Sequence, residues 1–398
     1  MKSDKSTPNV PTLRFKQYDD KWTICNLSDI ASVVGGGTPD TTDSLLWNGN
    51  VQWFTPTEVG HSKYVSKSVR TISQLGLQKS SAKMLPKGSI LLSSRATVGE
   101  CSIAKHECTT NQGFQSLIPK KGINNEFLYY LTQTKKKHFI KYASGSTFLE
   151  ISNSEIKKTK CAVPCIDEQA KIAELLSLLD ERIETQNKII EDLKILKKEL
   201  CSKLFKSMLC DSEIQISQIA NVYGGYAFSS KTYADNGKYK IVTIGNVTGD
   251  KYISGNFNTI DELPNNIQTQ QILNDGDILI SLTGNVGRIS IVRGEDYLLN
   301  QRVAKLNIKD KWMKEFVYQY LSCSSFEKDM CNAGQGAAQK NIKNEDILSY
   351  YIHIPSNKNV LEKIAIFLIA YDKKINNEEL ILLQLQTQKS YFLNAMFI

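Results

Sequence analysis

The apolar positions of this chain follow two different rhythms, and one of them occurs twice. Residues 168–208 hold no Gly or Pro, and apolar side chains return there in steps of four and three. This pattern is typical of a long helix that buries one face against a partner helix. The seam positions of this first helix are Ile172, Leu176, Leu179, Ile183, Ile190, Leu193, Leu200 and Leu204.

A second stretch near the end of the chain repeats this rhythm. Its seam positions are Ile364, Leu368, Tyr371, Ile375, Leu382, Leu385, Phe392 and Met396. Polar residues interrupt both seams at corresponding places, Gln186 and Lys197 in the first, Glu378 and Lys389 in the second. Two unrelated amphipathic surface helices are the alternative, but matching interruptions favour helices packed on each other. They run antiparallel if each begins at its own globular domain.

The second pattern occurs in the longer region ahead of each helix. There, short strand-like runs are interrupted by Gly, Asn, Ser and Pro. Shifting the sequence by 188 to 192 residues aligns it with itself along almost its whole length. Both copies place a Gly turn ahead of a short apolar run typical of a buried strand. Shared stretches include Leu85–Leu91 with Leu273–Leu279, Gly99 with Gly287, Asn111-Gln112 with Asn300-Gln301, and Gly145 with Gly334. So long a period predicts two units, each with its own core.

The expected fold class is therefore α+β. Two similar globular domains are separated by two long helices, which form an intramolecular antiparallel coiled coil with approximate two-fold symmetry. The boundaries we assign are 1–20 for an N-terminal segment, 21–163 for the first domain, 164–210 for the first helix, 211–354 for the second domain and 355–398 for the second helix.

Composition narrows the class of protein. With 41% apolar and 23% charged residues among 398, the chain is not a disordered tail. No window reaches the roughly 18 apolar residues of a membrane span, and residues 1–20 lack the apolar core of a signal peptide, so we expect a cytoplasmic protein. Nine cysteines without a Cys-x-x-Cys pair predict reduced thiols. A net charge of +8 is compatible with an anionic partner.

Motifs of catalysis are missing from the sequence. An exocyclic-amine methyltransferase needs adjacent prolines in an (Asp/Asn/Ser)-Pro-Pro-(Tyr/Phe) loop, and no two of the nine prolines are adjacent. The run Gly35-Gly36-Gly37-Thr38 lacks the Lys and the glycine spacing of a phosphate-binding loop. The four histidines have no Glu or Cys at metal-ligand spacing. We therefore expect a double-headed binding module with no catalytic residue and no metal site.

Three stretches carry a resemblance to a known family. They are Val10-Pro11-Thr12-Leu13-Arg14-Phe15 followed by Trp22, the Leu85–Leu91 run, and Pro164 leading into Glu168-Gln169-x-Lys171-Ile172. In this order, and together with the duplication, they resemble the specificity subunit of type I restriction-modification enzymes. The second copy departs from the pattern, because Val360-Leu361 stands where Glu-Gln is expected and Glu362 is shifted.

The resemblance implies a function and partners. Each globular domain would be a target recognition domain that reads one half of a bipartite, asymmetric site in double-stranded DNA, and the helices would set the spacer between the halves. Two modification subunits would dock on the chain and methylate an adenine at N6 in each half, after flipping the base. Restriction subunits would join them. No cofactor would bind this chain, since S-adenosylmethionine, ATP and Mg would belong to the partner subunits.

The duplication itself suggests where bases are read. Residues that build the fold or contact phosphate should be shared by both copies, whereas base readers should differ. The loops that align but disagree are 93–97 with 281–285 and 146–148 with 335–337. Arg95 suits guanine O6 and N7, Asn285 suits adenine N6 and N7, and Arg288 suits guanine or a phosphate.

The predicted DNA-binding residues include these loop positions and nearby lysines. Lysines of this kind contact the phosphate backbone or lie on a solvated face, and Lys197 on the helix is expected on such a face. For the loop residues, the alternative of polar turns in solvent stays open. The full predicted set is Ser94, Arg95, Thr97, Ser146, Thr147, Lys135, Lys137, Thr283, Asn285, Arg288, Gln335, Gln339 and Lys340.

Two hypotheses about function follow from the sequence. In the first, the chain is the DNA-recognition subunit of a multisubunit methyltransferase and restriction enzyme. In the second, it is a stand-alone coiled-coil DNA-binding or scaffolding protein of the same architecture. Dependence on a modification subunit separates them.

Overall fold

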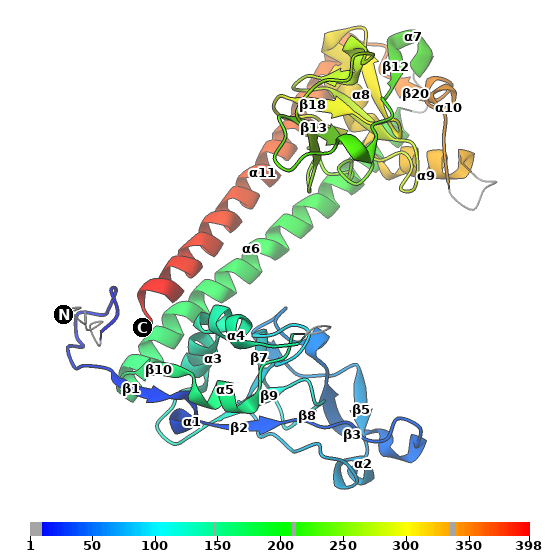
Figure 1. Cartoon of the computed structure of the whole chain (residues 1–398). Helices are drawn as coiled ribbons and strands as arrows, with labels where there is room; N and C mark the ends of the chain where they lie inside the picture. Colours follow the sequence, from blue (N-terminus) through cyan, green and yellow to red (C-terminus); the bar gives the residue numbers. More distant parts are fainter. Residues whose placement is uncertain (1–9, 146–148, 209–211, 335–339) are drawn as a thin grey trace. The chain divides into compact units, whose positions relative to one another are not determined.

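A computed structural model describes residues 10–145, 149–208, 212–334 and 340–398. The chain divides into two compact units, each made from one globular domain and one stretch of each long helix (Figure 1). Unit 1 is Met1–Gln186 with Ile381–Ile398, and unit 2 is Asn187–Leu380.

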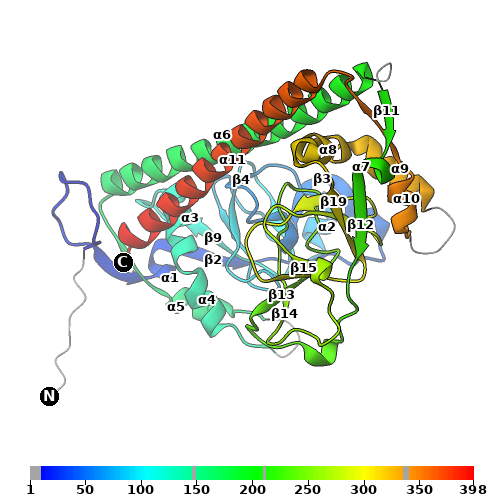
Figure 2. The same cartoon turned by 90° about the horizontal axis from the view of Figure 1, so that it is seen from above.

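The two long helices are α6 (Ile166–Ser207) and α11 (Lys358–Ala395). Ion pairs join the two helices in both units, and the two pairs of unit 2 show their direction. In unit 1, Asp180 of α6 pairs with Lys389 of α11 at 2.7 Å. In unit 2, Lys194 pairs with Glu379 at 2.7 Å and Lys197 with Asp372 at 2.5 Å. Partner numbers fall along α11 as they rise along α6, which confirms the antiparallel pairing (Figure 2).

The predicted seam of each helix lies on its inner side. The following seam residues are buried or half-buried: Ile172, Leu176, Leu179, Ile183, Ile190, Leu193, Ile364, Leu368, Tyr371, Ile375, Leu382 and Leu385. One expectation about the helices is wrong. The side chain of Lys197 is only 17% exposed and reaches the carboxylate of Asp372, so it lies in the seam and not on a solvated face.

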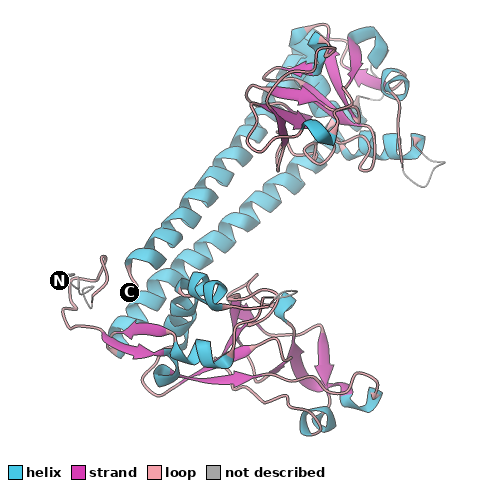
Figure 3. Cartoon of the chain, viewed as in Figure 1, coloured by secondary structure: helices cyan, strands magenta, loops and turns pink. Residues whose placement is uncertain are grey.

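Unit 1 holds three sheets and several short helices (Figure 3). The largest sheet has the order β2 (Ala31–Gly35), β9 (Gln115–Pro119), β6 (Ile90–Leu92), β7 (Cys101–Ala104), β4 (Tyr64–Val65). The others are β5 (Arg70–Ile72), β3 (Trp47–Phe54), β8 (Thr109–Thr110), and the pair β1 (Thr23–Asn26) with β10 (Lys160–Val163). The helices are α1 (Leu27–Ile30), α2 (Gln74–Gln78), α3 (Asn125–Thr134), α4 (Lys136–Tyr142), α5 (Asn153–Lys158), η1 (Ser44–Leu46) and η2 (Pro56–Glu58).

Unit 2 repeats this plan. Its first sheet has the order β12 (Ala220–Gly224), β19 (Val303–Ile308), β16 (Ile278–Ser281), β17 (Ile289–Ile291). The others are β14 (Asn258–Ile260), β13 (Tyr239–Val242), β18 (Tyr297–Leu299), β15 (Ile272–Leu273), and the pair β11 (Ser212–Gln215) with β20 (Tyr351–Ile354). The helices are α7 (Ile216–Ile219), α8 (Lys314–Leu321), α9 (Ser324–Ala333), α10 (Asn344–Leu348), η3 (Ser230–Thr232), η4 (Thr269–Gln271) and η5 (Lys311–Met313).

The duplication predicted from the sequence is therefore visible as matching topology. Strands β2, β9, β6 and β7 have the same order as β12, β19, β16 and β17. A parallel pair flanked by an antiparallel strand also recurs, as β8–β3–β5 in unit 1 and as β18–β13–β14 in unit 2. Together with the antiparallel helices, this confirms the predicted α+β fold.

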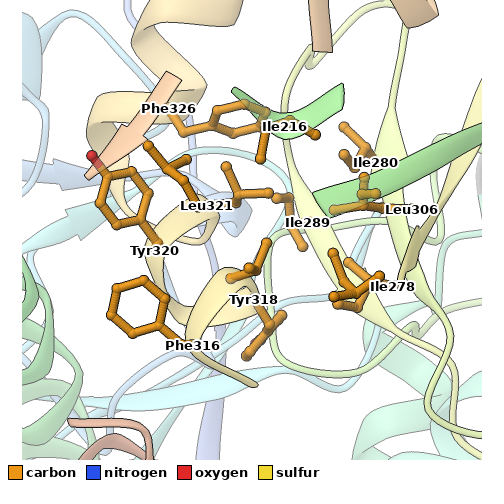
Figure 4. Close-up of a cluster of buried hydrophobic side chains, with 14 of the residues drawn as sticks. Ile216, Ile278, Ile280, Ile289, Leu306, Phe316, Tyr318, Tyr320, Leu321 and Phe326 are labelled. Carbon is orange, nitrogen blue, oxygen red and sulfur yellow. The ribbon is translucent and has the colours of Figure 1, made fainter. Parts of the chain in front are cut away.

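Each main sheet forms the core with the helix that follows it. In unit 2, Ile278, Ile280 and Leu306 of the sheet meet Phe316 and Leu321 of α8, and all five are at most 2% exposed (Figure 4). Side chains of a strand alternate between faces, so positions 278 and 280 point to the same side. In unit 1 the aligned α3 buries its Phe and Leu residues in the same way.

The Glu-Gln pair at the start of α6 connects three segments of unit 1. Glu168 is fully buried, and both of its carboxylate oxygens accept hydrogen bonds of 2.7 Å from Arg14. Gln169 accepts from the backbone N–H of Asn124 and donates to the carbonyl of Pro164. The second copy has Leu361 at the position of Gln169, and this leucine is buried in the core of unit 2.

A glycine shared by both copies marks a close approach of loop and helix. Gly287 has φ +80°, and a Cβ placed there would lie 2.8 Å from Cβ of Met330 in α9. Gly99 has φ +87° and meets Lys136 at the start of α4 in the same way. The two glycines are shared because the scaffold requires them, in agreement with the expectation from the duplication.

Replacing Gly287 by Ala should destabilise the chain more than replacing Gly276, whose φ is +83° but whose Cβ would make only ordinary contacts. Both changes strain the backbone, and only Gly287→Ala adds overlap, for a difference of about 1–3 kcal/mol in the free energy of unfolding. Chemical denaturation of the two variants measures it. Equal losses would show that α9 moves away at no cost.

Candidate nucleic-acid interface

In unit 1 the first predicted loop lies beside the residues that follow the second one. The chain turns after β6 through Arg95 and Ala96, which has φ +65°. Arg95 forms a β-bridge with Glu150, and the N–H of Ile151 donates to the carbonyl of Ser94 at 2.9 Å. The loop 93–98 is thereby joined to residues 149–151, which directly follow 146–148. We call these two segments loop pair 1.

Unit 2 builds the same arrangement at the aligned positions. Thr283 forms a β-bridge with Asn341, and the N–H of Ile342 donates to the carbonyl of Leu282 at 2.9 Å. Gly284, with φ +76°, occupies the place of Ala96. Loop 281–286 is thereby joined to residues 340–342, which directly follow 335–339. These two segments form loop pair 2.

The predicted readers differ in how far they reach the surface. The side chain of Arg95 is 47% exposed and lies 3.9 Å from the carboxylate of Glu150. Asn285, Lys137 and Lys340 are exposed. These four side chains are open to solvent at the surface of their units.

Other predicted residues are buried or hydrogen-bonded within the loops and stabilise them. Ser94 is fully buried, and its backbone is bonded to Gly113 on one side and Ile151 on the other. The hydroxyl of Thr283 donates to Asn341 at 2.8 Å, and that of Thr97 donates to the carbonyl of Pro56 at 3.2 Å. Ser146, Thr147, Gln335 and Gln339 lie outside the described residues.

Lys135 is directed away from the loops. Its ammonium group donates to the backbone carbonyl of Ile398 at 2.8 Å, at the end of the chain. Burial lowers the pKa of this lysine, because a charged group is less stable away from water. In this structure Lys135 therefore anchors the C-terminus of the chain to the start of α4.

An ion pair with reversed polarity supports each loop pair. In unit 1, Glu100 beside the loop pairs with Lys136 at the start of α4. At the aligned positions of unit 2, Arg288 pairs with Glu327 of α9 at 3.3 Å. Sequence reasoning assigned Arg288 to DNA and missed its partner, although a change of sign at both aligned positions was a signal for the pairing.

The described residues contain no group of three or more His, Cys, Asp or Glu side chains placed to hold a metal ion. The eight described cysteines are free thiols. Burial raises the pKa of Cys101 and of Cys108 to about 12, which disfavours their reactive thiolate form. Among the described helices, none is long and apolar enough to cross a membrane.

The fold and its loops define a duplicated protein, in which one α+β domain occurs twice and each copy presents its own loop pair. Comparison with known families identifies it further. The model of the type I restriction modification DNA specificity domain matches residues 19–194 and 212–387. The chain belongs to this family, which confirms the resemblance noted in the sequence.

Individual relatives agree with this assignment. The chain is 29% identical to the type I restriction enzyme MjaIX specificity subunit of Methanocaldococcus jannaschii, covering 91% of this chain and 89% of the relative. It is 27% identical to the EcoR124I/EcoR124II specificity subunit of Escherichia coli, covering 42% of this chain and 43% of that protein. Both relatives are specificity subunits of type I restriction enzymes, which agrees with the family to which this chain belongs.

Solved structures share the fold. The S subunit of a type I restriction-modification system from M. genitalium superposes with a TM-score of 0.55 at 18% identity, covering 98% of this chain and 99% of that one. A chain from a study of complex assembly and conformational transition of the type I R-M system gives a TM-score of 0.61 at 14% identity, covering 94% and 96%.

Arg288→Glu should destabilise unit 2, because it places two carboxylates together, and adding Glu327→Arg should restore stability. Since both side chains are partly exposed, we expect a coupling of about 0.5–1 kcal/mol. Chemical denaturation of the two single variants, the double variant and the parent measures it. The same cycle on Glu100 and Lys136 is the matched control with opposite signs. A coupling near zero would show that Arg288 is not held by Glu327.

Proposed function

We propose that the chain reads a bipartite, asymmetric DNA site, one half with each recognition domain. The observation that supports this most directly is the pair of equivalent loop pairs. Their backbones match in turn geometry and in bridges, whereas their exposed side chains differ, with Arg95 and Ala96 in one and Gly284 and Asn285 in the other. Equal scaffolds with unequal side chains suit two different base sequences.

The exposed side chains suggest specific base contacts. The guanidinium of Arg95 can donate two hydrogen bonds to O6 and N7 of guanine, and the amide of Asn285 can pair with N6 and N7 of adenine. Lys137 and Lys340 are placed to contact phosphates, to which the net charge of +8 adds general attraction. Ser94, Thr97 and Thr283 hold the loops in place.

We further propose that the helix pair sets the spacer and binds the modification subunits. Several large apolar side chains of α6 and α11 remain exposed, more than a lone helix pair in water needs. They are Leu178, Ile195, Leu196, Ile366, Phe367, Leu380, Leu383 and Tyr391. Two modification subunits docked there would methylate adenine N6 with S-adenosylmethionine, and restriction subunits would supply ATP- and Mg-dependent cleavage. The complex would act on cellular DNA in the cytoplasm.

Arg95→Ala should change the base preference of one half-site only, and Asn285→Ala that of the other. Losing a bidentate contact relaxes discrimination at one base pair by about 1–3 kcal/mol. Methylation of randomised half-sites by the chain assembled with its modification subunits measures this. Lys67→Ala, an exposed lysine outside both loop pairs, should change neither half. Altered preference in both halves after either substitution would contradict the assignment.

Inserting seven residues into both helices should lengthen the recognised spacer by roughly three base pairs, because seven helical residues span about 10 Å. The insertions belong between Gln186 and Asn187 and between Leu380 and Ile381, where the two units meet in sequence and internal contacts are kept. The same assay on a spacer series detects the change. Insertion into α6 alone, which shifts the helix register, is the control. If the recognised spacer keeps its length, the proposal that the helix pair sets the spacer is wrong.

A further inference from the structure

A buried carboxylate of α11 connects three elements of unit 2. Asp372, with a side chain 7% exposed, accepts from Lys197 of α6 at 2.5 Å. It also accepts from Lys251 at 2.9 Å and from Gln319 of α8 at 2.7 Å, both in the globular domain. Burial alone would raise the pKa of Asp372, but the two ammonium groups outweigh it and lower the pKa below its ordinary value. One charged aspartate thus joins both helices and the recognition domain.

Unit 1 has a counterpart on the other helix. Asp180 of α6 pairs with Lys389 of α11 at 2.7 Å and accepts from the hydroxyl of Tyr130 in α3 at 2.6 Å. Tyr130 aligns with Gln319, and Asp180 aligns with Asp372. Again a single carboxylate contacts the partner helix on one side and the recognition domain on the other.

A neighbouring contact in unit 1 strengthens the junction. Lys63, which aligns with Lys251, pairs with Glu126 of α3 at 3.0 Å. Glu126 also accepts from Tyr64 and from Ser177 of α6. Both lysines contact the aligned glutamate of their domain, since Lys251 also lies 3.9 Å from Glu315. Both also reach a long helix, Lys251 at Asp372 of α11 and Lys63 at Ser177 of α6.

We propose that Asp180 and Asp372 are positioning residues that hold each recognition domain at a fixed orientation on the helix pair. They thereby determine how strictly the assembled enzyme discriminates spacer length. This inference rests on the proposed function of the helix pair as a ruler. A ruler transmits length only if its ends are rigidly attached. The apolar cores hold each domain against the helices, and these aspartates add the directional contacts of that attachment.

The chemistry of the junctions suits that purpose. Hydrogen bonds to a charged group are directional and strong, and a buried carboxylate that loses its partners is destabilised. An apolar contact permits sliding, whereas the three donors on Asp372 and the two on Asp180 fix distance and angle together. The exposed pair of Lys194 with Glu379 offers a contrast, because it joins the same two helices with side chains 50% and 45% exposed.

The test compares Asp372→Asn and Asp180→Asn with Glu379→Gln as the matched control. Each chain is assembled with its modification subunits and assayed for methylation of DNA that carries both half-sites with spacers of varied length. We expect the parent and Glu379→Gln to accept one spacer length. In the two aspartate variants, discrimination against neighbouring lengths should fall about tenfold, while the preferred bases stay the same.

A purely structural role would give another result. If both aspartate variants melt at lower temperature but discriminate spacers as the parent does, the proposal is wrong. If Asp372→Asn does not assemble, Asp180→Asn decides, since its carboxylate is more exposed. Restored discrimination in Asp180→Lys combined with Lys389→Asp would add support. A parent enzyme indifferent to spacer length would contradict the proposed function itself.

Discussion

The helix pair depends on ion pairs whose members are exchanged between the two copies. Asp180 and Lys197 lie on α6, and their aligned counterparts Asp372 and Lys389 lie on α11. Antiparallel pairing brings each aspartate to the lysine of the other helix. A parallel pairing of aligned positions would bring aspartate to aspartate and lysine to lysine. Because buried unpaired charges cost about 3–5 kcal/mol, the charges select direction and register, while the apolar seam supplies most of the attraction.

In the globular domains, the duplication conserves the scaffold and leaves the loops free to diverge. Their scaffold positions are constrained by backbone geometry, as Gly99 and Gly287 show where a loop meets a helix. Their loops are constrained at the bridges that join the two segments of each pair and at the hydrogen bonds of Thr97 and Thr283. Between those bridges the side chains are free to differ. A specificity subunit can therefore keep one fold in both halves and still present two unlike surfaces.

The spacing of residues in the sequence predicted the duplication and the buried faces of the two long helices. The seam from Ile172 to Leu193 was predictable because the apolar face of a helix has the same period whatever packs against it. The same spacing placed Lys197 at a seam position, but its charge favoured a solvated face, because its partner Asp372 is remote in sequence. Ser94 was taken for a surface residue because a polar type after a strand usually is one. Its burial arises from chain segments on both sides, around Gly113 and Ile151, which no local pattern reveals.

The reversed ion pairs beside the loops have a consequence for any exchange of segments between the two repeats. A change that copied only the loop side of unit 1 into unit 2 would place a glutamate at position 288 against Glu327. The reverse change would place an arginine at position 100 against Lys136. Each loop therefore suits the helix residue of its own repeat, and like charges oppose a partial exchange.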